Sequence, residues 1–248
     1  SGGPGRRGVR ANGRDLHELP LMVDAYERWP RLHEDLGAPT GYERVGHLQL
    51  YERHHDIGYA DTRAKVQTAL GVPTRHLDAR AVHDVEPGLS DRVLGALHAP
   101  LDGTADHEAT TRAYAAAAER AGVVIRRGAR AVSLVRRGDR VTALTLASGE
   151  VIDTPGQVLL VANGGTAPLV AQATGQALPI WTIYPQVVVS TPAAVAPFQS
   201  YVGHLHRPVA LKMVPGTAVM LSGGWRGRLS AETGRGETIP ASVTGNWA

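Results

Sequence analysis

Hydrophobic positions in the first part of the chain follow mainly the three- and four-residue spacing of helices. This spacing runs through residues 16–36, where Pro30 is expected to bend or break the helix. It returns over residues 59–70 and, more weakly, over residues 79–85, which predicts two further helices. Residues 1–14 lack periodic apolar positions, so this opening stretch is predicted to be a loop.

Two segments with the pattern of short strands lie between these predicted helices and one further helix. Residues 47–51 and 93–99 carry the apolar pattern of short strands. Asp106 is a good N-cap for an alanine-rich helix over residues 107–121, and Gly122 suits the left-handed conformation that ends a helix. The first half of the chain therefore predicts helices mixed with a few strands.

The second half changes to the two-residue period of strands. Glycine-containing turns separate three alternating segments, which predict an antiparallel meander. Residues 158–162 are apolar at every position, as in a central strand buried on both faces, and a helix is expected near Pro168. The strands expected in this half are 123–125, 131–135, 141–146, 150–153, 158–162, 181–190, 210–214 and 218–222.

Composition narrows the chemistry. The 248 residues include no cysteine, which excludes disulfides, zinc–thiolate sites, a cysteine nucleophile and flavin attachment through cysteine. A chain without cysteine fits a reducing compartment, so we expect a cytoplasmic protein, and no apolar run is long enough to predict a membrane span. The net charge is +3, but only Lys65 and Lys212 are lysines and the arginines are scattered among acidic residues. Without a concentrated basic stripe, no nucleic-acid partner is expected.

Three other motifs do not support a site. Residues 3–8 match the dinucleotide-binding pattern G-x-G-x-x-G, but no strand precedes them, so we interpret the match as chance. No G-x-S-x-G motif occurs, which argues against a hydrolase. His204 and His206 share one strand face and His54–His55 forms another pair, but no carboxylate or third ligand follows at a defined spacing. The expectation is therefore that no metal is bound.

The order of helix, short strand, meander, buried strand and small-residue turn resembles the FAD-dependent D-amino-acid oxidase-like superfamily. This superfamily includes glycine oxidase, sarcosine oxidase and the β subunits of heteromeric amine oxidases. The segments that carry the resemblance are the glycine-rich stretch 8–15, the step 101–106 with the helix after it, the turn 161–165 and the hairpin 211–225. The superfamily's first strand, dinucleotide fingerprint and C-terminal glycine-rich segment are not found here. The sequence thus resembles the middle of a longer protein, and we expect it to bind FAD weakly or not at all by itself.

The resemblance implies a fold and an activity. The fold class is α/β, with an FAD/NAD(P)-binding-like nucleotide domain and an inserted, β-rich, antiparallel substrate domain. The cofactor is FAD, and the reaction is oxidation of the C–N bond of a small amine or amino acid by hydride transfer to the flavin. The resemblance is compatible with a partner subunit in a heteromeric oxidase. The alternative to an enzyme is a non-catalytic subunit or scaffold that uses the same fold for protein contacts. The implied boundaries are 1–44, 102–174 and 224–248 for the FAD-binding domain, and 45–101 and 175–223 for the substrate domain.

The resemblance also implies site residues. The expected FAD contacts are Arg7, Gly8, Val9, the backbone of Val132, and Ala162, Asn163 and Gly164. Lys212 is the candidate catalytic residue, since a lysine that faces flavin assists oxygen reduction or binds a substrate carboxylate. The alternative is a surface lysine on an edge strand. The candidates for the substrate pocket are Tyr184, Arg207 and Trp225, which an ordinary sheet face also contains.

Overall fold

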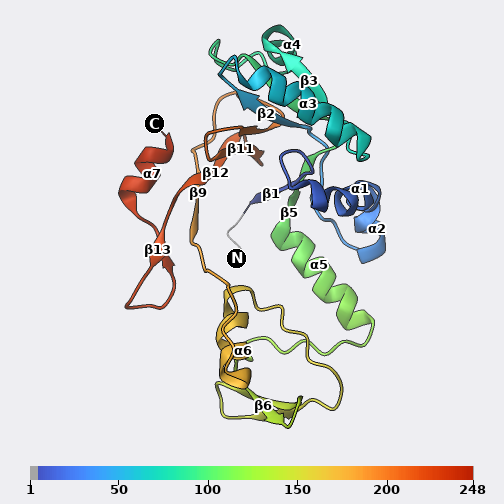
Figure 1. The fold of residues 1–248 in the computed structure, drawn as a ribbon, viewed down its shortest axis with the longest axis vertical. Helices are drawn as coiled ribbons and strands as arrows, with labels where there is room; N and C mark the ends of the chain where they lie inside the picture. The colour runs from blue at the N-terminus through green and yellow to red at the C-terminus, as the bar shows by residue number, and fades with distance from the viewer. Residues whose placement is uncertain (1–4, 248) are drawn as a thin grey trace. The chain divides into compact units, whose positions relative to one another are not determined.

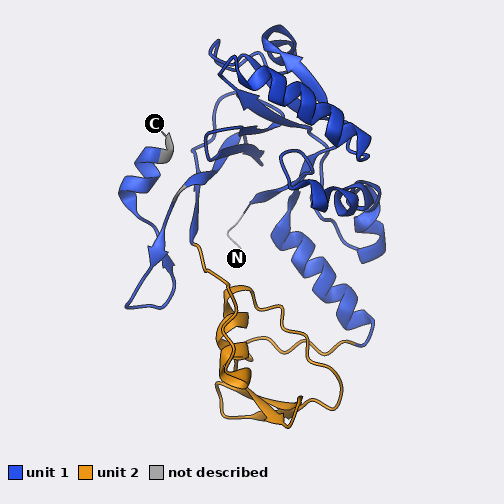
Figure 2. Cartoon of the chain, in the orientation of Figure 1, with its two compact units in different colours: residues 1–122, 184–248 blue, residues 123–183 orange. Residues whose placement is uncertain are grey.

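The computed structural model describes residues 5–247, and of Trp225, Asn246 and Trp247 the backbone alone. The chain forms two compact units, residues 1–122 with 184–248 and residues 123–183 (Figures 1 and 2). The elements are β1 (Arg6–Val9), η1 (Leu16–Glu18), α1 (Leu19–Arg28), η2 (Trp29–Arg31), α2 (Leu32–Leu36), β2 (His47–Tyr51), α3 (Asp56–Ala69), β3 (Arg75–Asp78), α4 (Ala79–Val85), β4 (Gly95–Ala99), β5 (Gly103–Asp106), α5 (His107–Arg120), β6 (Ala131–Arg137), β7 (Arg140–Leu146), β8 (Val151–Asp153), η3 (Asn163–Gly165), α6 (Thr166–Thr174), β9 (Pro185–Val189), β10 (Tyr201–His204), β11 (Val209–Val214), β12 (Ala218–Arg226), β13 (Arg228–Leu229), β14 (Gly236–Glu237) and α7 (Pro240–Trp247).

A seven-stranded sheet forms the centre of the first unit. Its order is β3-β4-β2-β10-β11-β12-β9, and only the β2–β10 pair is parallel. Apolar side chains of β2, β4 and β10 pack against α4, with Leu48, Ala96, Val202 and Val82 in one buried cluster. The sheet thus brings Tyr201 opposite His47, two residues that are far apart in the sequence.

A two-stranded ribbon corrects the loop predicted for the start of the chain. Residues 6–9 form β1, which pairs antiparallel with β5 so that Arg6 lies opposite Asp106. The sequence pattern could not show this strand, because its stabilising hydrogen bonds come from β5, almost 100 residues later. Side chains join the same segments, since Arg6 donates to Thr104 Oγ1, 98 residues away.

Helices of the first unit follow the predicted pattern closely. The 16–36 segment breaks into α1 and α2 at Trp29–Pro30, as expected. Helix α5 begins after Asp106, whose carboxylate accepts hydrogen bonds from Glu108 N and Ala109 N, and Gly122 adopts a left-handed φ of 87°. The buried face of α5 packs through Ala113 on Leu32 and Leu36 of α2.

The second unit contains the predicted meander. Strands β6, β7 and β8 form a three-stranded antiparallel sheet, and α6 lies against β6. Leu134 N donates to Gln172 Oε1 at 3.1 Å, which ties this sheet to α6.

Two strands predicted in the second unit are absent from the described residues. Segments 123–125 and 158–162 have no strand conformation, and the side chains of Val124, Leu159 and Val161 are about four-fifths exposed. An apolar strand forms only where neighbouring strands accept and donate its backbone hydrogen bonds. Within this unit the described strands are those of the meander, and none of them pairs with these segments.

The two compact units record packing and do not assign function to any segment. The predicted division into an FAD-binding domain and a substrate domain therefore stays a prediction. Within residues 5–247, none of the helices combines the length and the apolar character needed to span a bilayer.

Candidate functional site

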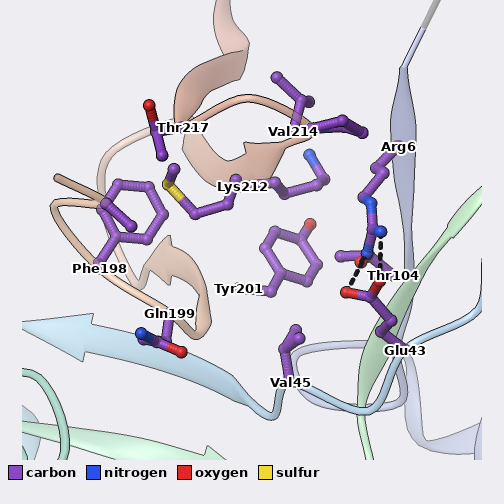
Figure 3. A pocket seen from close by; sticks show the side chains of 13 residues that line it. Arg6, Glu43, Val45, Thr104, Phe198, Gln199, Tyr201, Lys212, Val214 and Thr217 are labelled. Atoms are coloured by element: carbon purple, nitrogen blue, oxygen red, sulfur yellow. Dashed lines mark hydrogen bonds and ion pairs between the residues drawn. The ribbon is translucent and has the colours of Figure 1, made fainter. Parts of the chain in front are cut away.

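A pocket of about 280 Å³ opens beside the sheet of the first unit (Figure 3). Lys212 and Tyr201 lie at its centre, with the Arg6–Glu43 pair on one side and Phe198 on the other. Strands β1, β5, β10 and β11 and the loops beside them supply its wall. The lining residues are Arg6, Glu43, Val45, Thr104, Ala196, Phe198, Gln199, Tyr201, Lys212, Met213, Val214, Pro215 and Thr217.

Lys212 is a buried cation. It lies on β11, which has β10 on one side and β12 on the other, and its side chain is 3% exposed. Its Nζ donates a hydrogen bond to Ser222 Oγ at 2.9 Å and lies 4.7 Å from the centre of the Tyr201 ring. The alternative of a surface lysine on an edge strand is therefore wrong.

The charge of Lys212 has no nearby carboxylate to balance it in the described part of the chain. Burial, and to a smaller extent the charges of Arg7 and Arg10, lower the pKa of Lys212 from its usual 10.5 to about 8. All of these effects disfavour the ammonium form. A pocket with this electrostatic character favours an anion, since an anion beside Lys212 would offset both the burial and the repulsion.

Arg6 differs from Lys212 because its charge is already paired. Its guanidinium contacts both carboxylate oxygens of Glu43 (Figure 3) and donates to Thr104 Oγ1 at 3.2 Å. This ion pair lowers the pKa of Glu43. Lys212 is thus the lining cation that still lacks an anionic partner among the described residues.

Tyr201 forms the floor below Lys212 and is held by close packing. The His47 ring lies against it, tilted by 54°, with the ring centroids 4.4 Å apart. A Cβ on Gly8 would lie 2.4 Å from Tyr201 Cε1, so the β1 backbone approaches the ring at a distance that only glycine permits. Gly8 therefore has a clear packing role.

His47 adds a second buried polar group below the pocket. Its Nδ1 has no hydrogen-bond partner within residues 5–247 and lies 3.8 Å from Asp102 Oδ2, too far for a hydrogen bond. Burial holds the pKa of His47 well below its ordinary value, and the charges of Arg10 and Lys212 act in the same direction. His47 is therefore neutral near pH 7.

Asp102 lies next to His47, with its Oδ2 3.8 Å from His47 Nδ1. It is fully buried, and its carboxylate accepts hydrogen bonds from Ala11 N (2.7 Å), Asn12 N (3.0 Å) and Tyr26 Oη (2.6 Å). Burial raises the pKa of Asp102, while these three donors oppose the rise. Asp102 thus fixes the segment after β1, and with it the position of β1 at the pocket.

The structure brings only some of the predicted site residues together. Arg7, Gly8 and Val9 lie on β1, on a strand rather than on a loop, and they are partly buried. Arg7 Nη1 contacts Met220 Sδ at 3.5 Å, and its charge acts on Lys212. These residues and Lys212 belong to one neighbourhood.

Two of the three predicted substrate residues, Tyr184 and Arg207, are not among the described residues that line this pocket. Tyr184 packs on Gly236 and accepts a hydrogen bond from Gly227 N through its backbone oxygen. Arg207 follows β10 and pairs with Glu52 at 2.6 Å. Trp225 belongs to β12, but its side chain lies outside the described residues.

The remaining FAD candidates belong to the second unit. Val132 lies on β6 with 44% of its surface exposed, so it is not a core residue. Ala162 and Asn163 are exposed, and Gly164 approaches Thr182, where a Cβ would lie 2.4 Å from Oγ1. They do not follow a buried strand, because segment 158–162 is not a strand here. Asn163 nevertheless has a left-handed φ of 49°.

Sequence reasoning missed Tyr201, His47, Glu43 and the buried role of Asp102. Their importance depends on the β2–β10 and β1–β5 pairings, which join distant segments. In the sequence, Asp102 stood out only as part of the step 101–106. A charged residue placed directly before a strand of small residues was the one available hint of burial.

Two curated relatives of the chain are D-amino acid dehydrogenases by name. A D-amino acid dehydrogenase of Methylobacterium radiotolerans is 29% identical over 222 residues, covering 86% of this chain and 52% of the relative. A D-amino acid dehydrogenase of Rhizorhabdus wittichii is 31% identical over 160 residues, covering 63% and 38%. The chain thus spans about half the length, or less, of these relatives.

Solved structures share the fold at low sequence identity. L-proline dehydrogenase from P. horikoshii matches 98% of this chain and 63% of its own with a TM-score of 0.81 and 20% identity. Glycine oxidase from Geobacillus kaustophilus matches 92% and 63% with a TM-score of 0.76 and 20% identity. These matches confirm the predicted fold class. The family model described as FAD dependent oxidoreductase (DAO) covers residues 3–242, which confirms the resemblance, and the chain belongs to this family.

Proposed function

We propose that the chain is the substrate-binding part of an FAD-dependent enzyme that oxidises the C–N bond of a small amino acid or amine. The observation that carries this proposal is Lys212, a buried ammonium that lines a small pocket without a carboxylate partner among the described residues. A substrate carboxylate is the partner that fits this position. The names of the relatives and structural neighbours, D-amino acid dehydrogenase, glycine oxidase and L-proline dehydrogenase, support an amino-acid substrate.

Pocket size and lining support a small substrate. Its volume of about 280 Å³ lies just below the usual range for ligand pockets, roughly 300–1,000 Å³. Apolar side chains such as Phe198 and Val214 line the pocket together with the charged group of Lys212. We infer that Lys212 holds the carboxylate while the apolar wall accepts a short side chain and excludes water.

The charged residues of the first unit fit an anionic group. For FAD itself, some of the predicted contact residues fit and Gly8 does not. FAD, when bound, supplies the acceptor for the two electrons that leave the C–N bond. Lys212 and Arg7 provide positive charge suited to an electron-rich edge of the flavin or to a carboxylate. The space on the Cβ side of Gly8 is filled by Tyr201, so Gly8 does not leave a cradle for the cofactor on that side. Val9, Val132, Ala162, Asn163 and Gly164 stay proposed FAD contacts, and Tyr184, Arg207 and Trp225 stay proposed substrate contacts.

The two lysines of the chain allow a matched test in the full-length protein. Lys212→Met removes the buried charge, whereas Lys65→Met removes an exposed charge that pairs with Asp61 on α3. We expect Lys212→Met to lower kcat/KM for D-amino acids, glycine and L-proline by about tenfold or more, and Lys65→Met to leave it unchanged. Carboxylate-free amines serve as the second comparison, since their turnover should not depend on Lys212.

Rapid kinetics separates the two roles considered for Lys212. Loss of a carboxylate contact raises KM and slows reduction of the flavin by substrate, whereas loss of oxygen activation slows reoxidation of reduced flavin. Unchanged half-reactions in Lys212→Met would disprove a role of this residue in either step. A full-length protein that binds no FAD and oxidises none of these substrates would support the non-catalytic alternative instead.

A further inference from the structure

A cluster of histidine and aspartate lies at the far end of the same sheet from the Lys212 pocket. His55 and Asp56 stand at the start of α3, shortly after β2, and His206 follows β10. Strands β2 and β10 are parallel, so the segments after their carboxyl ends meet at one edge of the sheet. Tyr201, at the start of β10, faces the pocket instead.

The geometry of this cluster is close to that of a metal site. His206 Nε2 lies 2.8 Å from Asp56 Oδ1, and His55 Nε2 lies 3.6 Å from the same oxygen. One potential ligand atom from each of the three residues lies within 4.8 Å of the other two. Sequence spacing alone gave no third ligand, because Asp56 and His206 are 150 residues apart.

Asp56 supplies an independent sign that a cation is expected here. Its side chain is only 5% exposed, and its Oδ2 has no hydrogen-bond partner in the part of the chain that the structure describes. A buried carboxylate oxygen without a donor is costly, and the hydrogen bond from His206 engages only Oδ1. An ordinary Asp–His pair therefore leaves half of this carboxylate unsatisfied.

Neighbouring groups do not satisfy Asp56 either. Arg207, next to His206 in sequence, pairs with Glu52. His204 Nδ1 accepts hydrogen bonds from His206 N and Arg207 N, so this nitrogen carries no proton and cannot bind a metal at the same time. His204 instead holds the backbone of the loop that positions His206.

We propose that His55, Asp56 and His206 bind a divalent transition-metal ion of the zinc class, with water as the fourth ligand. Two imidazole nitrogens and one carboxylate oxygen form a ligand set that zinc accepts, at bond lengths of about 2.0–2.2 Å. His55 is 73% exposed, so its ring can turn toward the other two ligands without disturbing the core. The ion would link the start of α3 to the loop after β10 and complete the coordination of Asp56.

Zinc titration of the chelator-treated chain tests this site. We expect one Zn²⁺ to bind per chain by calorimetry, and Co²⁺ to give the visible absorption of a tetrahedral nitrogen–oxygen site. His55→Ala and His206→Ala should each weaken the affinity by about tenfold or more, while His54→Ala, an exposed neighbour outside the cluster, should leave it unchanged.

His55→Ala is the decisive variant, because an exposed side chain can be removed without loss of the fold, which a circular dichroism melt checks. Equal zinc affinity in the wild type, His55→Ala and His206→Ala would overturn the proposal, as would the lack of stoichiometric binding. Zinc should also raise the melting temperature of the wild type and of His54→Ala by clearly more than that of His55→Ala. This test needs neither flavin nor catalytic turnover, so it is independent of the proposed oxidase activity.

Discussion

Two buried charged residues of the first unit, Asp102 and Lys212, have neighbours with opposite effects: they stabilise the charge of Asp102 and disfavour that of Lys212. Both side chains are at most 3% exposed. The carboxylate of Asp102 accepts three hydrogen bonds from Ala11, Asn12 and Tyr26, and these donors oppose the effect of burial on its pKa. Lys212 has a neutral hydroxyl and a ring as neighbours, and the charges of Arg7 and Arg10 add to the effect of burial.

This difference separates a structural charge from a functional one. The chain itself supplies the hydrogen-bond donors of Asp102, because they come from the segment after β1 and from α1. Lys212 is strained electrostatically unless an anion arrives from outside. A buried charge that the fold does not satisfy is the kind of group that ligand-binding sites retain.

The largest expected effect follows from removing the structural charge. Asp102→Ala leaves two buried backbone N–H groups and the Tyr26 hydroxyl without an acceptor, and should lower the free energy of unfolding by about 3–5 kcal/mol. Urea unfolding of the chain measures this change, with Asp91→Ala, at a fully exposed position, as control. A loss no larger than that of Asp91→Ala would show that the network contributes little.

Gly8→Ala tests the packing that supports the functional charge. The new methyl group would meet the buried Tyr201 ring, which lies against Lys212, and we expect a loss of about 2–3 kcal/mol in the free energy of unfolding. Gly58→Ala on α3 meets no atom within 4 Å and should instead be neutral or stabilising by about 0.5–1 kcal/mol. Similar stability of the two variants would mean that Tyr201 moves aside at little cost.

Lys212→Met should stabilise the ligand-free chain, the opposite of the Asp102 result. The lowering of the pKa from 10.5 to about 8 means that burying the charged ammonium costs roughly 3 kcal/mol of folding free energy at neutral pH. The variant removes this cost but also loses the contacts of Lys212 with Ser222 and Tyr201, which reduces the gain. We expect a net gain of about 1–2 kcal/mol in urea unfolding at pH 7. A clear loss of stability would place Lys212 with Asp102 among the structural charges.

The pH dependence gives a smaller effect with a defined sign. Between pH 8 and 10.5 the unfolded chain holds a proton on Lys212 that the folded chain has lost, so the cost of burying the charge fades and stability from this residue rises with pH. Carboxylate binding runs the other way, because it needs the ammonium form. The affinity for acetate, followed by NMR, should be constant well below pH 8 and then fall toward about tenfold per pH unit, and Lys212→Met should abolish this dependence.

Local patterns predicted most elements of the first unit, because their signals lie within a few residues. The break at Pro30, the cap at Asp106 and strand 47–51 all follow from short-range chemistry. Strand β1 was missed because its pairing partner, β5, lies far along the chain. The apolar segment 158–162 was misassigned because apolar character predicts burial only where a partner surface exists, and Leu159 and Val161 have none among the described residues.

The candidate site was predictable in part. Lys212 stood out because it is one of two lysines in a chain rich in arginine, but its burial depends on β10 and β12 on either side of it. Tyr201 and His47 carry no sequence signal, since a strand register brings them together. Asp56 and His206 show the same limit, because sequence spacing does not reveal ligands that meet only across a parallel strand pair.

The protonation of Lys212 can be measured directly, because the chain has only two lysines. With lysine labelled with ¹³C at Cε, the NMR spectrum contains one resonance from Lys212 and one from the exposed Lys65, which Lys212→Met assigns. The account predicts that Lys212 titrates with a pKa of about 8 in the ligand-free chain and that acetate raises this pKa. A pKa at or above the usual 10.5 in the ligand-free chain would contradict the claim that Lys212 is a buried cation awaiting an anion.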